Sequence, residues 1–192
     1  MHSVVFFDLE FTAWEGSMAQ GWLAPGQFRE VVQIGAVKMD AATLETRGEF
    51  ERLVRPRINR ELSIYLENLT GITNAMIAER GIDFETAYRE FVSFADGAAI
   101  ASFGRDDHVL ERNLALYGIH DAPGLPPHMN VVPWLAKQGI DMKGLHACDV
   151  ARMCGAAFEG RAHDALDDAR SVAAGMCAVI GRGADNPFAG SK

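Results

Sequence analysis

The sequence predicts a single α/β domain in which helices cover one sheet. Three runs rich in β-branched and aromatic residues come early in the chain, and helical patterns alternate with short apolar runs after them. This order of elements is typical of an α/β sheet with helices packed on it. A length of 192 residues suits one domain with a sizeable core. We expect the domain to span residues 1–180 and a flexible tail to span residues 181–192.

Five segments have the composition and length of strands. They are apolar or alternating, and prolines follow two of them and favour an end to the strand there. In chain order they are Val4–Phe11, Val31–Val37, Phe50–Val54, Ala98–Phe103 and His128–Val132, with Pro56 and Pro133 as the two prolines.

Five further segments have helical patterns. Asp83 is placed to cap the second of them, and glycines at positions 118 and 155 close the third and fourth. The predicted helices are Leu62–Leu69, Phe84–Ala95, Asp107–Tyr117, Leu145–Cys154 and Asp164–Ile180.

The segment Ala13–Arg29 is predicted to be a loop of 17 residues that holds Trp14 and Trp22. A loop of that length inside a compact domain is more often functional than idle. The two tryptophans would either stack on bases or anchor the loop by packing.

Composition excludes several classes of protein. The net charge of −8 argues against broad, non-specific binding to nucleic acid. No apolar run is long enough for a membrane span, and the run Val4–Phe7 is too short for a signal peptide. The three cysteines lack the C-x-x-C spacing of a zinc site. We therefore expect reduced thiols and a cytoplasmic protein.

Two carboxylates stand at the end of the first predicted strand, in "FFDLEFT". Asp8 and Glu10 share one face of the strand, about 7 Å apart, while Phe7, Leu9 and Phe11 occupy the other face. Two oxygen ligands on a rigid edge suit Mg²⁺ or Mn²⁺ better than zinc. The alternative is a strand end that reaches solvent with two acids of no special role.

A second acidic pair, Asp106 and Asp107, follows the apolar run Ala98–Phe103 where a strand passes into a helix. Open α/β sheets place their ligand sites at the carboxyl ends of strands, so this junction is a candidate site. The alternative is that these residues cap the helix, and one of the two is expected to do so.

A third cluster lies in "RAHDALDDAR". Asp168 borders the apolar face of the predicted helix, whereas Asp164 and Asp167 point nearly opposite and are expected to be solvated. His163 stands five residues before Asp168 and can reach the same point only from a loop ahead of the helix. Gly160 makes such a loop reasonable. We expect the other five histidines to be structural or exposed.

Together, "FFDLEFT", "EVVQIGAV", "SFGRDD" and "HDALDDA" resemble the motifs of DEDDh-type 3′→5′ exonucleases, a group that includes RNase T and the proofreading exonucleases of replicative polymerases. "LTGIT", preceded by "LSIYLEN", resembles more narrowly the histone-mRNA 3′-exonuclease branch, which trims structured RNAs. The resemblance runs from Val4 to about Ala174. It implies an RNase H-like fold with a mixed five-stranded sheet whose first three strands are antiparallel.

The resemblance also implies the site. Asp8, Glu10, Asp107 and Asp168 match the four metal-site acids, and His163 matches the catalytic histidine. Asp107 is chosen over Asp106 because it is the sixth residue of the pattern that begins at Ser102. The implied cofactors are two Mg²⁺ ions, for which Mn²⁺ would substitute.

The implied function is metal-dependent removal of nucleoside monophosphates from single-stranded 3′ ends, with RNA preferred over DNA. Substrate contacts are expected from the first strand, from the "LTGIT" segment and from a basic run that could equally be a solvated strand end. The residues are Leu9, Phe11, Thr70, Gly71, Ile72, Arg57 and Arg60.

Three alternatives remain open at this point. The first is a DNA exonuclease of the proofreading type. The second is a phosphatase with Asp8 as a covalent nucleophile, for which Thr12 is suggestively placed. The third is a non-catalytic RNA-binding module, although no metal-site acid of the resemblance is missing.

Overall fold

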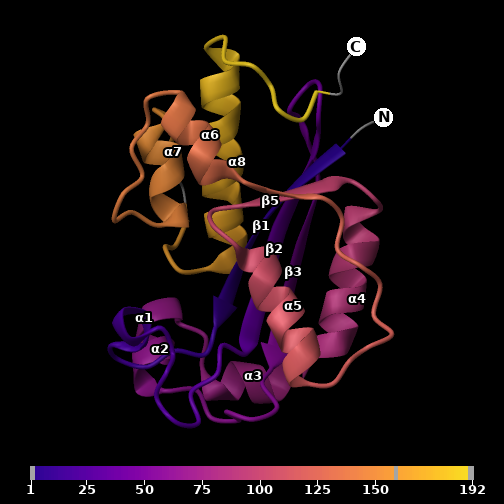
Figure 1. Cartoon of the computed structure of the whole chain (residues 1–192), viewed down its shortest axis with the longest axis vertical. Coiled ribbons are helices and arrows are strands. Elements are labelled where there is room, and N and C mark those ends of the chain that lie inside the picture. Colours follow the sequence, from indigo (N-terminus) through magenta and orange to yellow (C-terminus); the bar gives the residue numbers. More distant parts are fainter. Residues whose placement is uncertain (1–2, 158–159, 190–192) are drawn as a thin grey trace.

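The computed structural model describes residues 3–157 and 160–189 and contains one six-stranded sheet (Figure 1). The strands lie in the order β4-β3-β2-β1-β5-β6. β1 to β3 pair antiparallel, whereas β5 runs parallel to both β1 and β6, and β4 runs parallel to β3. The strand bounds are β1 Ser3–Phe11, β2 Val31–Asp40, β3 Thr46–Arg55, β4 Ile82–Asp83, β5 Ala99–Ser102 and β6 His128–Asn130.

Eight α-helices and one 3₁₀ helix, η1, are present in the described residues. The longest helix, α8, has 17 residues, and none of the helices in the described part of the chain could cross a membrane. The bounds are α1 Ser17–Gln20, α2 Ile64–Thr70, α3 Asn74–Arg80, α4 Phe84–Ala95, α5 Asp106–Leu116, α6 Val131–Lys137, η1 Ala147–Asp149, α7 Val150–Met153 and α8 Ala165–Gly181.

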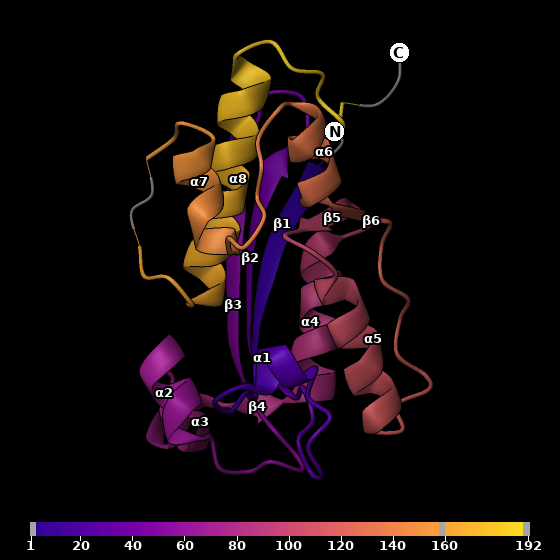
Figure 2. The same ribbon diagram turned by 60° about the vertical axis from the view of Figure 1, so that its left-hand side comes forward.

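The central strand β1 is buried on both faces, which Figure 2 shows with helices on either side of the sheet. Val4 and Phe6 pack in the core cluster that includes α7 and α8. Val5, Phe7 and Leu9 pack in the opposite cluster with α4 and α5. Because side chains alternate along a strand, Asp8 and Glu10 continue the row of Val4 and Phe6 and face α8. The alternation expected from the sequence is confirmed.

The helices α2 and α3 lie at the end of the sheet where β1 finishes (Figure 1). A third, smaller apolar cluster packs these helices against the sheet. It joins the start of the long loop to β2, β3 and the two helices, through Ala13, Val32, Leu53, Leu62, Leu66, Ile72 and Ile77. Trp22 packs against it, and its indole Nε1 donates to the backbone oxygen of Thr12 at 2.9 Å. The predicted long loop is therefore anchored, and it contains the short helix α1.

The sheet has one strand more than the five expected. The additional strand, β4, has only two residues, too few to give a recognisable strand pattern in the sequence. The last predicted strand, His128–Val132, ends earlier than expected, because α6 begins at Val131 and contains Pro133 in its first turn. Proline is tolerated there because the first turn of a helix needs no backbone donor. Asn130 caps this helix by accepting from Val132 N. The helix α3 was not predicted.

The chain after α8 is not free as far as residue 189. Phe188 makes an edge contact with Phe6, with ring centroids 5.4 Å apart, and the side-chain amide of Asn186 donates to the Ala41 carbonyl at 2.8 Å. The described part of the predicted tail thus contacts the domain, and residues 190–192 lie outside the described residues. The expectation that the tail from residue 181 is flexible stays a prediction.

Gly35 in β2 permits the close approach of α8 to the sheet. A Cβ atom at this position would lie 2.1 Å from Leu166 N and 2.2 Å from Ala165 C, both backbone atoms of the first turn of α8. Only a residue without a side chain fits there. The approach sets the position of that turn, which carries Asp168 three residues after Ala165.

We predict that Gly35→Ala destabilises the protein, because the added methyl must displace helix backbone. Overpacking of this kind costs about 1–3 kcal/mol or more. Gly48→Ala is the matched control in the neighbouring strand, since its Cβ would meet only Phe94 at 3.7 Å. We expect that control to change the free energy of unfolding by about 0.5 kcal/mol or less. Urea unfolding of both variants checks this, and equal stability would contradict the packing role of Gly35.

Candidate active site

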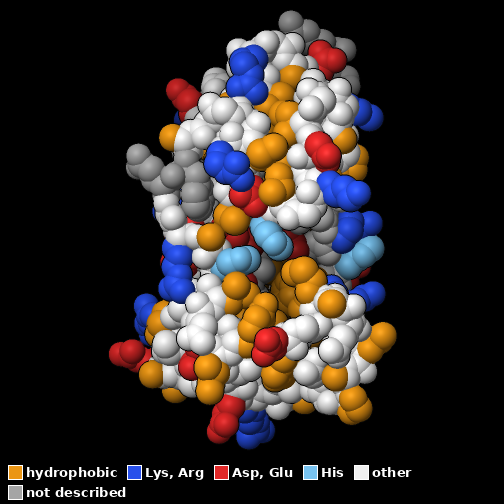
Figure 3. All heavy atoms as spheres, turned by 90° about the vertical axis from the view of Figure 1, so that its left-hand side faces the viewer, with side chains coloured by type: hydrophobic (Ala, Val, Ile, Leu, Met, Phe, Trp, Pro, Cys, Tyr) orange, Lys and Arg blue, Asp and Glu red, His pale blue; other side chains and the backbone are white. Residues whose placement is uncertain are grey.

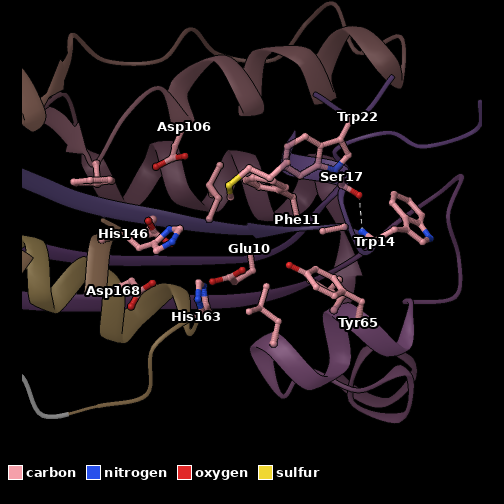
Figure 4. A pocket seen from close by; sticks show the side chains of 18 residues that line it. Glu10, Phe11, Trp14, Ser17, Trp22, Tyr65, Asp106, His146, His163 and Asp168 are labelled. Atoms are coloured by element: carbon pink, nitrogen blue, oxygen red, sulfur yellow. Dashed lines mark hydrogen bonds between the residues drawn. The ribbon is translucent and has the colours of Figure 1, made fainter. Parts of the chain in front are cut away.

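Three of the four acids of the predicted site converge on one pocket of about 180 Å³. β1 and β5 are parallel, so their carboxyl ends meet at the same edge of the sheet, where a site is expected. Figure 3 shows histidine and acidic side chains gathered at mid-height of this face, above a gathering of hydrophobic side chains. In Figure 4, acids and histidines lie at one end of the pocket and aromatic side chains at the other.

Three of the predicted acids line this pocket. Asp8 and Glu10 extend from the end of β1, and each is only 8% exposed. Asp168 lies on the first turn of α8 and is 3% exposed. Atoms of Glu10, His163 and Asp168 that could bind a metal all lie within 4.8 Å of one another. The predicted orientation of Asp168 toward the sheet is thus confirmed.

The fourth acid in the pocket is Asp106, whereas Asp107, which was predicted for this place, faces away from it. Both residues lie in the first turn of α5, where consecutive side chains diverge by about 100°. Asp107 is held on the other side of the helix by Arg105, whose Nε and Nη2 donate to its two carboxylate oxygens at 2.9 and 2.8 Å. The geometry corrects the position predicted from the spacing of the motif.

Electrostatic repulsion in this pocket is strong. Burial, followed by the charges of Asp168 and Asp106, raises the pKa of Glu10 to about 8. Burial also raises the pKa of Asp106 and that of Asp168 to about 7. The pKa of Asp8 is raised well above its usual value by burial and by the same neighbouring acids. The four carboxylates of the site therefore favour neutralisation, by bound protons or by bound cations.

The donor set fits divalent cations. Among the described residues, Asp106 Oδ2 and Asp168 Oδ1 are buried oxygen atoms without a hydrogen-bond partner. Buried carboxylate oxygens are normally paired, so two without a partner in this acid cluster point to a ligand. An all-carboxylate set with one adjacent imidazole suits Mg²⁺ or Mn²⁺. Asp8, Glu10, Asp106 and Asp168 are the residues that could hold such ions.

His163 reaches the pocket from the loop before α8, as the sequence predicted. Its backbone has φ 62°, a left-handed conformation that is uncommon for histidine and typical of functional sites. The loop is held by Asp167, whose carboxylate accepts from Arg161 N at 2.8 Å and pairs with Arg170 at 2.7 Å. Burial lowers the pKa of His163, which keeps the imidazole neutral near pH 7.

Asp164 and Asp167 are not simply solvated. Asp164 caps α8 by accepting from Leu166 N and Asp167 N, and it also accepts from the Gln33 amide at 3.1 Å. Asp164 and Asp167 therefore hold the helix and the loop. Neither residue lines the pocket, as the sequence predicted.

Sequence patterns did not find all residues of the pocket. His146, at the start of η1, faces His163 with ring centroids 5.6 Å apart. Tyr65, Leu66 and Leu69 line the pocket from α2. Their helix was predicted, but no spacing in the sequence marks which of its residues point at the site, and an isolated histidine carries no signal.

Leu9 and Phe11 line the pocket as expected, whereas Thr70, Gly71 and Ile72 do not. The Thr70 hydroxyl donates to Leu66 O and accepts from Ile72 N, so it stabilises the end of α2. Ile72 belongs to the small apolar cluster.

Arg57 and Arg60 line a separate hollow. There, Arg57 pairs with Asp83 at 2.7 Å and lies over the Tyr117 ring, and the structure does not bring it to the acids.

Both tryptophans of the long loop line the pocket. One face of Trp22 is covered by Arg29, 3.9 Å from its ring centre, and Phe11 makes an edge contact with it. Thr12 is only 2% exposed, and its hydroxyl is bonded to the backbone at Phe28 and Glu30. A phosphatase role for Thr12 therefore finds no support.

We predict that the metal-free protein loses stability as the pH rises from about 6.5 to 8.5. The raised pKa values mean that the folded state binds more protons than the unfolded state in this range, so the free energy of unfolding falls with pH. The lowered pKa values of His128 and His163 make stability rise with pH instead. This opposite effect is confined to pH values below about 6.5, the pKa of histidine in the unfolded chain.

The measurement is the unfolding temperature in EDTA across this range, repeated with Mn²⁺. We expect Mn²⁺ to raise the unfolding temperature more at pH 8.5 than at pH 6.5. Asp8→Asn is the control that removes one of the repelling charges and should flatten the slope in EDTA. A metal-free protein whose stability rose with pH in this window would contradict the repulsion.

Comparisons with known proteins identify the family and the fold. Residues 5–175 match the RNase T family, which is described as exonuclease. The chain is 25% identical, over an alignment of 213 residues, to the 3′-5′ exonuclease Snipper of Drosophila melanogaster. The alignment covers 94% of this chain and 70% of that protein.

Solved structures show the same RNase H-like exonuclease fold. The nuclease domain of 3′hExo, a DEDDh family member bound to rAMP, has a TM-score of 0.81 at 21% identity, with 99% of this chain and 97% of that chain covered. A 3′-exonuclease solved for 3′-end specific recognition of a histone mRNA stem-loop has a TM-score of 0.76 at 20% identity, with 94% and 82% covered. Since the family match covers most of the chain, the protein belongs to the RNase T family of exonucleases.

Proposed function

We propose that the protein hydrolyses the last phosphodiester bond of single-stranded 3′ ends, with RNA preferred over DNA, and releases nucleoside monophosphates. The observation that carries this proposal is the convergence of Asp8, Glu10, Asp106, Asp168 and His163 on one pocket that continues into an aromatic wall. The acids and the histidine suit the hydrolysis of a phosphodiester, and the aromatic wall suits unpaired bases.

Two Mg²⁺ ions, for which Mn²⁺ substitutes, supply the activation of a water and the stabilisation of the leaving oxygen when they are bound. Glu10 and Asp168 would hold one ion, Asp106 would hold the other, and Asp8 would contribute to holding them. This assignment follows the grouping of Glu10, Asp168 and His163, from which Asp106 is separate. Asp106 takes the role that the motif spacing gave to Asp107.

His163 is the proposed general base. It lies beside Glu10 and Asp168, the acids assigned to the side of the attacking water. The lowered pKa leaves the imidazole free to accept a proton from the water near neutral pH. The unusual φ angle of its backbone supports a position fixed for this task.

The aromatic end of the pocket would hold the bases next to the 3′ terminus. Trp14, Trp22 and Tyr65 line it, and an aromatic ring stacks on any base without sequence preference. A base in a duplex is already stacked and paired, so this wall favours an unpaired end.

The preference for RNA draws support from the two solved relatives, one bound to rAMP and the other named for a histone mRNA. Discrimination needs a polar group near the 2′-hydroxyl of the last sugar. Since the Thr70 hydroxyl is used within its own helix, the backbone of Glu10 and the hydroxyl of Tyr65 are the candidates on the pocket wall.

We also infer a cytoplasmic enzyme, because the three cysteines are all free thiols. Such thiols are typical of a reducing compartment. Proteins that act outside the cell more often join them in disulfides.

The test compares end-labelled RNA and DNA oligomers of one sequence, with free and with phosphate-blocked 3′ ends, in Mg²⁺ and in EDTA. We predict a ladder of single-nucleotide steps from the free 3′ end, faster on RNA and absent in EDTA. Asp106→Asn should abolish the ladder. Equal rates on DNA would favour the proofreading-type alternative. Cleavage within blocked strands would contradict an exonuclease, and full activity in EDTA would contradict the metal assignment.

A further inference from the structure

A hollow of about 200 Å³ lies beside the active-site pocket, and Trp22 lines both of them. Figure 4 shows Trp22 at the end of the pocket away from Glu10 and Asp168. Arg29 and Arg112 line the hollow, which we call the Arg29–Arg112 hollow. A strand with its last phosphodiester at the acids and its end bases along the aromatic wall would reach this hollow next.

The two arginines of the hollow have no carboxylate partner. Within residues 3–157 and 160–189, neither guanidinium forms an ion pair. The positions of α5 that could reach Arg112, residues 108, 109, 115 and 116, carry no acid. Glu30, next to Arg29 in the chain, is 0% exposed, and its carboxylate accepts from the backbone N–H groups of residues 57–59. Two positive charges therefore stand together without an ion-pair partner.

Arg29 is held in place by contacts that leave its charge unpaired. Its guanidinium lies over the Trp22 ring, 3.9 Å from the ring centre. Its backbone carbonyl accepts from the Asn113 amide at 2.7 Å, and Asn113 Oδ1 accepts from Val31 N at 3.0 Å. Asn113 is 1% exposed and follows Arg112 directly in α5. The same buried amide thus fixes the backbone beside both arginines.

Holding these charges together has an electrostatic cost. Burial, followed by the charge of Arg112, lowers the pKa of Arg29, against the opposing charge of Asp106. A partly buried charge without a partner destabilises a fold, so a hollow that keeps two such charges is suited to an anion. Planar guanidinium groups with free N–H donors match the geometry of phosphate.

The hollow also offers a surface for a base. Phe28 lines it beside the arginines and is 38% exposed. The backbone of Phe28 is fixed by Thr12, whose hydroxyl donates to Phe28 O and accepts from Glu30 N. An exposed aromatic ring stacks on any base without sequence preference. Cations for a phosphate and a ring for a base together suit a nucleotide.

We propose that the Arg29–Arg112 hollow binds a nucleotide of the substrate strand upstream of the 3′-terminal one, with its phosphate at the two guanidinium groups and its base against Phe28. This inference rests on the proposed function and adds the path of the strand beyond the site of hydrolysis. The contrast with Arg57 supports the choice, because the charge of Arg57 is already paired with Asp83. Contacts so far from the reacting bond would affect KM and leave kcat unchanged.

The test uses Arg29→Gln and Arg112→Gln in the full chain with Mg²⁺. kcat and KM are measured on a single-stranded RNA oligomer with a free 3′ end, and AMP is measured as an inhibitor that stands for the product at the terminal position. We expect each variant to raise KM ~3–10-fold, the contribution of about one hydrogen bond. kcat and the inhibition constant of AMP should not change, because the terminal position is intact.

Salt dependence gives a second measurement. Each neutralised phosphate of a single strand contributes about −0.7 to the slope of log affinity against log salt concentration. We expect the slope of log(1/KM) to be shallower by about 0.7 in the double variant, because one phosphate contact is lost.

Arg80→Gln is the matched control, because it removes the same charge at another place. Arg80 lies in the last turn of α3, is exposed and lines neither the pocket nor the hollow. We expect it to leave KM, the salt slope and the inhibition by AMP unchanged.

An unchanged KM for RNA in both arginine variants would overturn the inference. An equal rise of KM in Arg80→Gln would overturn it too, because it would show only long-range attraction. An inhibition constant of AMP raised as much as KM would mean that the variants distort the pocket through Trp22, and this result would also contradict the inference. Should Arg29→Gln loosen the loop, Arg112→Gln decides, because Arg112 is exposed.

The proposed function and this inference fail in different ways. An unaltered protein that degraded RNA, beside variants with unchanged KM, would refute this inference alone. An unaltered protein that degraded no RNA would refute the proposed function and this inference with it.

Discussion

Four carboxylates share one water-poor pocket, and the repulsion between them is the constraint that the rest of the structure must meet. Burial and mutual charge raise the pKa values of Glu10, Asp106 and Asp168 to about 7 or 8. A flexible site would relieve this strain by moving the acids apart or into solvent. Here the acids stay together because each is attached to a rigid element. Bound cations would therefore offset the repulsion between them.

That rigidity comes from the packing of β1 and α8. β1 is buried on both faces, so the positions of Asp8 and Glu10 are fixed by the two main core clusters. Gly35 lets the first turn of α8 lie against β2, which brings Asp168 to the same point.

Gln33, which is 1% exposed, fastens that contact between β2 and α8. Its amide donates to Asp164, and its carbonyl accepts from Ala165 N at 2.9 Å. One glycine and one buried glutamine of β2 therefore hold the first turn of α8, and with it Asp168, against the sheet.

Much of this arrangement could be predicted from local patterns. Alternation along β1 and the apolar face of α8 placed Asp8, Glu10 and Asp168 correctly, because a strand or helix with a buried face has only one orientation. The choice between Asp106 and Asp107 could not be made this way. It depends on where α5 begins and on Arg105 and His128, and His128 lies on a strand 21 residues further along the chain than Asp107.

Other differences have the same origin in contacts between distant segments. The packing of Phe188 on Phe6 joins the two ends of the domain, and no short pattern announces it. His146 reaches the pocket because η1 packs beside α8, not because of its neighbours in sequence. Pro133 was interpreted as the end of a strand, but in the first turn of a helix the same residue is equally acceptable.

The most direct test of the account is the location of Mn²⁺ by anomalous diffraction from crystals of the protein soaked in Mn²⁺. The account predicts two Mn²⁺ ions in the pocket, in contact with Asp8, Glu10, Asp106 and Asp168, while Asp107 remains bonded to Arg105 and free of metal. An ion bound to Asp107 with Asp106 unused, or a pocket that takes up no Mn²⁺, would contradict it.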